Sequence, residues 1–179
     1  MAWIPIISGM SAWFESKNAS DEDATAKHIA DLYKSAAIAV QPTLFFSNPV
    51  SLNDASIIAN GFSESFKLAK IIESGQLSST IWLPAATAIV SFWSGTSFSP
   101  LVPPPGGLIG ATNMIVSAGL PTPLNEDIAV AFSQDSASSS AEKLNTAFTN
   151  HLLSITGIWI GTSPGSPPPP FSFPWNGLQ

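Results

Sequence analysis

Hydrophobic side chains recur at helical spacing over residues 21–40. The run begins after Ser20, a residue type common at helix N-caps, and acids occupy 21–23, where the positive end of a helix dipole favours them. Pro42 ends the pattern, because proline cannot continue a helix. These features predict a first helix over 21–40.

Two further stripes of the same period follow. Residues 51–75 open with Ser51 and Asp54, a variant of the capping box, and close at Gly75, which suits a helix C-terminus. Residues 81–94 are apolar almost all round, so a helix there should be central in the molecule. Each stripe predicts one helix.

The second half of the chain is less regular. Residues 95–124 have the composition of loops, with one short extended stretch between Gly110 and Gly119 that periodicity cannot assign. A short helix fits 125–133, and a helix that begins at a capping box, Ser139 and Glu142, fits the segment up to about 155.

We therefore predict a mainly α fold: a small bundle-like body of about four to five helices with proline-rich loops and an extended C-terminal arm. The chain length suits a single domain. Within it we expect an apolar N-terminal segment (1–19), a helical body (20–161) and an arm rich in proline and aromatic residues (162–179).

Charge is scarce and unevenly placed. Only 10% of the residues are charged, against about a quarter in ordinary domains, and the chain has no Arg and a net charge of -6. This balance argues against direct binding to nucleic acid and favours a subunit with buried contacts. The absence of cysteine excludes disulfides and thiolate metal sites.

No charged residue lies between Glu73 and Glu126, which raises the question of a membrane. The best apolar run, 81–93, is shorter than the roughly 20 residues of a spanning helix and contains Pro84. The first residues lack the basic region and the cleavage pattern of a signal peptide. We expect neither a signal peptide nor an anchor.

Few residues suggest chemistry. Gly161–Gly165 match the G-x-S-x-G pattern of a hydrolase nucleophile, but no acid or histidine follows Ser163, and we interpret the segment as a loop. His28 and His151 are assigned structural roles, and the acids at 20–23 a capping role. We therefore expect no enzyme, no catalytic residue, no metal site and no cofactor.

The C-terminal segment carries the strongest hypothesis. Prolines at 167–170, like those at 103–105, favour a stiff polyproline conformation, and apolar side chains then alternate with small or polar ones. Such an arm fits an apolar groove, either on its own chain or on a neighbour. The residues expected at interfaces are Trp3, Trp13, Trp82, Trp93, Trp159, Phe171, Phe173, Trp175 and Leu178.

The function expected from these features is that of a structural subunit in a large assembly. The assembly that we expect is a bacteriophage virion (capsid, neck, tail or baseplate) assembled in the host cytoplasm. Its partners would be other structural proteins of the assembly or copies of itself. A membrane-active or pore-forming helical protein is one alternative, with the uncharged residues 74–125 inserting. A hydrolase centred on Ser163 or His28 is the other.

Overall fold

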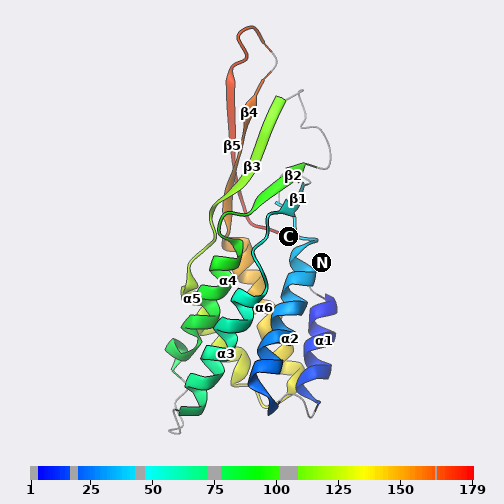
Figure 1. Ribbon diagram of the computed structural model, residues 1–179, viewed down its shortest axis with the longest axis vertical. Helices are drawn as coiled ribbons and strands as arrows, with labels where there is room; N and C mark the ends of the chain where they lie inside the picture. Colours follow the sequence, from blue (N-terminus) through cyan, green and yellow to red (C-terminus); the bar gives the residue numbers. More distant parts are fainter. Residues whose placement is uncertain (1–3, 17–19, 43–46, 72–77, 101–108, 164) are drawn as a thin grey trace.

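The molecule is elongated, with a bundle of helices at one end and an antiparallel sheet that projects from it (Figure 1). The computed structural model describes residues 4–16, 20–42, 47–71, 78–100, 109–163 and 165–179. The helices are α1 (Ile4–Phe14), α2 (Glu22–Ala37), α3 (Ser56–Ile71), the 3-10 helix η2 (Ser79–Trp82), α4 (Leu83–Trp93), α5 (Pro121–Phe132) and α6 (Ala137–Ser154). The strands are β1 (Ser47–Val50), β2 (Ser97–Pro100), β3 (Ile109–Ser117), β4 (Thr156–Thr162) and β5 (Pro170–Asn176).

The prediction of a mainly α fold is wrong. The described chain contains a five-stranded antiparallel sheet in the order β1-β2-β3-β4-β5 beside its helices, so the fold is mixed α and β. The sequence predicts an extended arm here, because the prolines at 167–170 favour a polyproline conformation. β5 also carries Pro174. Proline is tolerated in a strand at the edge of a sheet, and β5 is an edge strand.

The predicted helices are confirmed, with small shifts at their starts. α2 is capped by Asp21, whose side chain accepts a hydrogen bond from the Ala24 amide at 3.0 Å, rather than by Ser20. α6 begins one turn earlier than expected, at a cap formed by Ser136. α3 starts at Ser56, whose amide donates to the Asp54 carboxylate at 2.8 Å, and Ser51 has a left-handed backbone conformation with φ 59°. The N-terminal helix α1 was not predicted.

The helices enclose a core rich in aromatic residues. The Trp93 indole donates a hydrogen bond of 2.7 Å to the Tyr33 hydroxyl, and the Tyr33 ring meets Phe148 edge-on at a centroid distance of 4.8 Å. Trp82 and Phe132 stack with 4.3 Å between their ring centroids. Buried aromatic pairs of this kind each contribute about 0.5–1.5 kcal/mol beyond the area they bury.

α3 and α4 come into direct backbone contact at Gly61. A Cβ placed on this residue would lie 2.4 Å from the Ala88 Cβ and 2.7 Å from the Pro84 carbonyl oxygen. The Ser65 hydroxyl, one turn along α3, accepts a hydrogen bond from the buried Ala85 amide at 3.2 Å. A small residue at 61 is therefore required for this pair of helices.

β4 and β5 form a long hairpin that extends well beyond the bundle (Figure 1). Its last pair before the turn is Thr162 with Pro170, and the Ser163 amide donates to the Pro169 carbonyl at 3.0 Å. At the other end, Gly177 turns the chain back towards α6 with φ 82°. The sheet is thereby anchored to the bundle at the C-terminal end of β5.

The last three residues form this anchor. The Gly177 and Leu178 amides donate to the carbonyls of Ile155 and Leu152, and the backbones of Gln179 and Gln41 exchange two hydrogen bonds of 2.7 and 2.8 Å. Leu178 is buried in the main core. The end of the predicted C-terminal arm (162–179) thus docks on its own chain.

Candidate functional site

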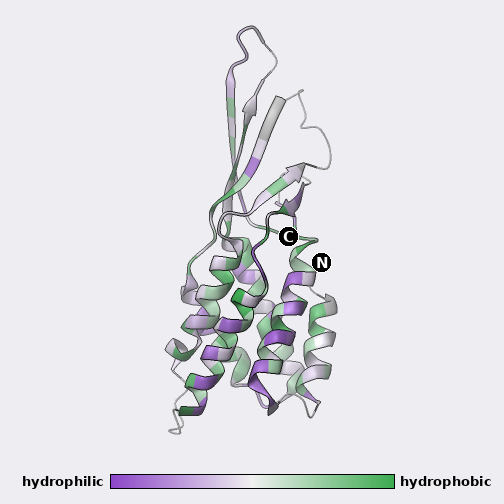
Figure 2. Ribbon diagram, in the orientation of Figure 1, coloured by the Kyte–Doolittle hydropathy of each residue, from purple (hydrophilic) through white to green (hydrophobic). Residues whose placement is uncertain are grey.

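The sheet carries no charged residue. None of the residues of β1 to β5 is Asp, Glu, Lys or His, and the chain has no Arg. The charged residues of the described chain lie on the helices and on the connections that lead to or from them. Figure 2 shows this contrast, with strongly hydrophilic positions concentrated along the helices. The projecting arm, which we define as β3, β4 and β5, is thus uncharged over its whole length.

One face of the arm exposes a central group of apolar side chains. Register places Met114 opposite Ile158 and Ile158 opposite Pro174, so these three side chains share a face. Ile160 lies on the same face, two residues along β4. Met114 is 40% and Ile160 42% exposed. We call this surface the outer face.

Polar but uncharged residues surround that apolar centre. Thr112 and Ser172 lie opposite Ile160 on the neighbouring strands, and Ser97 lies opposite Met114. Val116, at an irregularity of β3 close to the bundle, adds a side chain that is 66% exposed. An apolar centre with a polar rim is the usual arrangement of a protein interface.

The opposite face of the sheet belongs largely to the core. Trp175 covers Gly157, where an added Cβ would lie 2.0 Å from the indole, and Trp175 also meets Phe98 edge-on. Its Nε1 donates a hydrogen bond of 2.6 Å to the Asn113 Oδ1. Asn113 in turn donates from Nδ2 to the Ser47 hydroxyl at 3.1 Å. This buried chain of hydrogen bonds links β5, β3 and β1.

The residues expected at interfaces fall into three groups: those that are buried, those that are partly exposed, and one that the structure does not describe. Five are buried within the chain itself and offer no surface in this conformation: Trp82, Trp93, Trp159, Trp175 and Leu178. Trp13 is half-buried and stacks on His28 at 4.2 Å, and Phe171 stacks on Phe173, which is 42% exposed. Trp3 lies outside the described residues.

Sequence reasoning missed Met114, Val116 and Ile160, which are exposed apolar residues of the arm. Phe173, which it did include, is as exposed as Ile160 but lies on the opposite face. The available signal for these missed residues was a run of three apolar residues in each segment, Met114–Val116 and Ile158–Ile160. It is short in both segments, and it becomes distinctive only when the two segments are paired as β3 and β4.

The residues considered for catalysis, His28, His151 and Ser163, all lie in surroundings that fit a structural role. His151 is 4% exposed and its Nε2 lies 2.8 Å from the Ala118 carbonyl oxygen; burial lowers its pKa to about 4. His28 is stacked on Trp13, and its Nε2 lies 3.4 Å from the Gly9 carbonyl oxygen. Ser163 lies in the β4–β5 connection, where a strand leads into another strand and not into a helix. This is not the strand-to-helix turn of a hydrolase nucleophile.

The acids at the start of α2 face α3. Asp23 accepts a hydrogen bond from the Ser63 hydroxyl and lies 3.3 Å from the Lys67 ammonium, and these contacts lower its pKa. Glu22 pairs with Lys70. Among the described residues, no group of three or more His, Asp or Glu side chains could hold a metal ion. The prolines at 103–105 lie outside the described residues.

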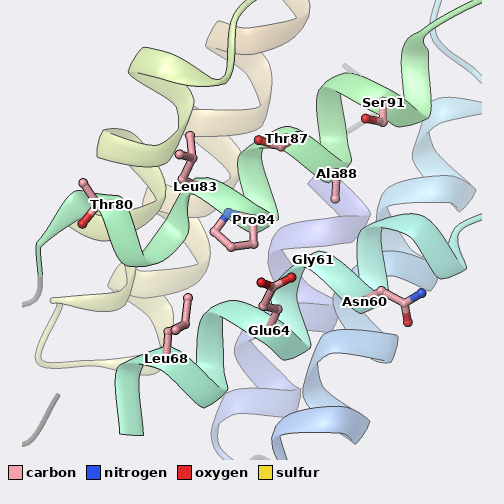
Figure 3. A pocket seen from close by; sticks show the side chains of 10 residues that line it. All are labelled: Asn60, Gly61, Glu64, Leu68, Thr80, Leu83, Pro84, Thr87, Ala88 and Ser91. Atoms are coloured by element: carbon pink, nitrogen blue, oxygen red, sulfur yellow. The ribbon is translucent and has the colours of Figure 1, made fainter. Parts of the chain in front are cut away.

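A shallow groove of about 530 Å³ runs between α3 and α4 (Figure 3). Gly61 and Ala88 form its narrow floor, and Leu68, Leu83 and Pro84 contribute apolar walls. Glu64 is the one charged residue of the ten that line it. Four more of the lining residues are polar and uncharged: Asn60, Thr80, Thr87 and Ser91.

None of the helices in the described ranges has the length and hydropathy needed to cross a membrane. No protein-family model, no curated protein and no solved structure matches the chain. The functional argument therefore rests on the arm itself.

Proposed function

We propose that this chain is a structural subunit of a large protein assembly, in which the uncharged arm contacts neighbouring subunits and the helical bundle forms a stable base. The assembly that we propose is a bacteriophage virion. The observation that carries the proposal is the arm: a projecting sheet without a single charge whose outer face exposes Met114 and Ile160. Such a surface is costly in water and is stabilised by contact with another protein.

The construction of the molecule also supports a structural role. Its bundle has a continuous core, and the arm is fastened to it by the C-terminal hydrogen bonds and by the buried Trp175. A rigid arm loses little conformational entropy when it binds, because its strands are already ordered. The histidines and the acids of α2 are engaged in contacts within the chain, which fits a role other than catalysis.

The mass of the native particle tests the proposal. We expect the chain to sediment in a complex of megadalton size in a native extract, and to be found by mass spectrometry in virions purified on a density gradient. Recovery of the chain only as a monomer of 18.7 kDa would contradict the proposal.

A variant connects the particle to the arm. Ile160→Asp places a charge on the outer face, and we expect it to prevent incorporation into the particle, since a buried unpaired charge is strongly unfavourable. Ile71→Asp is the matched control, because Ile71 is 76% exposed at the end of α3, far from the sheet. Leakage of liposomes caused by the purified wild-type protein would instead favour the membrane-active alternative.

A further inference from the structure

We propose that the outer face of the arm is a self-association surface, on which two copies of this chain pack sheet against sheet with their bundles pointing apart. This inference rests on the proposed function and specifies one of its contacts. Its first support is the position of charge. Two copies with a net charge of -6 repel each other, and the strands of the arm are where they can meet without bringing charged side chains together.

The apolar centre of the outer face is suited to such packing. Met114, Ile158 and Ile160 have the side-chain types that fill the space between the two sheets of a β-sandwich. The surrounding Thr112 and Ser172 can remain hydrated at the rim. A second copy presents the same uncharged surface, so no unpaired charge is buried when the two meet.

The free edge of β5 is poorly suited to the alternative of strand addition. Pro170 and Pro174 lie opposite Thr162 and Ile158, and a proline is accommodated in the β4–β5 ladder only where its nitrogen points away from β4. Since the ladder alternates, Ser172 and Asn176 also direct their amides outward. Of the four β5 residues whose nitrogens point outward, the two prolines lack an N–H donor. A strand added at this edge would therefore lose hydrogen bonds, which favours contact through the outer face.

The area of the face sets the strength of the contact. Three strands of about seven residues cover roughly 24 Å by 14 Å, or about 340 Å². A stable dimer of standard size buries about 800 Å² on each partner. We therefore expect a weak dimer with a dissociation constant on the order of 100 µM, which further contacts would reinforce inside an assembly.

Sedimentation velocity of the purified chain, from about 10 µM to about 500 µM, measures this association. We expect the wild-type protein to change from monomer to dimer over this range, and Ile160→Lys to raise the dissociation constant at least about tenfold. Ile71→Lys, the same substitution on α3, should leave it unchanged. Circular dichroism verifies that both variants are folded.

Cysteine cross-linking gives a second measurement that does not depend on a charged variant. The chain has no cysteine, so a single introduced thiol forms a disulfide only with its copy. In a two-fold packing the central strand β4 meets itself, and we expect Ile158→Cys or Ile160→Cys to cross-link under oxidation. Phe171→Cys, at the β5 edge on the opposite face, should not.

Two results would overturn the proposal. A wild-type protein that stays monomeric to about 500 µM excludes self-association through this face. If the protein is monomeric but Ile160→Asp still prevents its incorporation into the native particle, the outer face binds a different protein and the proposed function stands. Cross-linking of Phe171→Cys without that of Ile158→Cys or Ile160→Cys would show that two copies meet through the β5 edge or the opposite face. A dimer without any native particle would support this inference and contradict the structural role.

Discussion

The buried contact between Trp175 and Asn113 should be a main determinant of how firmly the arm is held. The Trp175 indole donates to the Asn113 Oδ1 at 2.6 Å, and each of these side chains is 1% exposed. The indole also lies directly on Gly157, so β4 and β5 are packed together at this point without an intervening side chain. Removing the indole should therefore affect both packing and hydrogen bonding.

Trp175→Phe separates the two contributions. Phenylalanine keeps most of the ring but lacks the N–H donor, so the buried Asn113 Oδ1 loses a partner at a cost of about 1–3 kcal/mol. The smaller ring leaves part of the space above Gly157 empty, which adds about 1 kcal/mol. We expect a total loss of about 2–4 kcal/mol in the free energy of unfolding. Trp175→Ala should cost more, about 5 kcal/mol, because the whole side chain is lost.

Urea unfolding followed by far-ultraviolet circular dichroism measures these changes, since removing a tryptophan would alter a fluorescence signal. Phe173→Ala is the control, an aromatic residue of the same strand that is 42% exposed. It should cost less than about 1 kcal/mol. The reasoning is refuted if Trp175→Phe unfolds within about 0.5 kcal/mol of the wild-type protein, or if Phe173→Ala is equally destabilising.

Three further perturbations test other parts of the structure. Gly61→Ala should lower the free energy of unfolding by about 2–3 kcal/mol, because the added Cβ would lie 2.4 Å from the Ala88 Cβ. Thermal unfolding measures this loss, and adding Ala88→Gly to the same chain should recover part of it. Removal of residues 177–179 deletes four backbone hydrogen bonds and the buried Leu178, so we expect a loss of about 3–5 kcal/mol; an unchanged urea midpoint would show that the anchor is dispensable. His151, whose pKa burial lowers from 6.5 to about 4, is protonated first in the unfolded chain, so stability should fall by about 3 kcal/mol as the pH decreases from about 6.5 to about 4. His151→Gln, which can still donate to the Ala118 carbonyl, should flatten this part of the pH profile, and an unchanged slope would exclude His151 as its cause.

The helices could be predicted from the sequence because their signals are local. Apolar residues such as Ile58 and Phe62 recur within one or two turns, and a cap lies next to the helix that it stabilises. Errors occurred at the helix ends, as at Ser139, where several neighbouring serines could each act as the cap and Ser136 does so. α2 likewise ends at Ala37 and not at 40. α1 escaped prediction because its residues are apolar on most sides and show no stripe.

The strands could not be predicted in the same way, because what stabilises them is far away in the chain. Trp159 pairs with Asn113 on one side and with Phe173 on the other, and none of these segments has a long alternating pattern of its own. The side chains of the C-terminal arm were expected to fill a groove. Trp175 does so, but the groove belongs to its own chain and includes Gly157.

The distribution of charge contained more information about the arm than the hydrophobic pattern did. The chain has two long segments without Asp, Glu or Lys, 74–125 and 144–179, and each taken alone suggested a different explanation, a membrane segment or a proline-rich tail. The structure pairs them: β2 and β3 come from the first segment, and β4 and β5 from the second. Strands from the two uncharged segments lie side by side in one sheet and so share one environment. The same environment can therefore explain why both segments lack charged residues. Water would tolerate lysine or glutamate on the exposed side of a sheet at little cost, so this exclusion of charge is the observation on which the proposed contact with another protein rests.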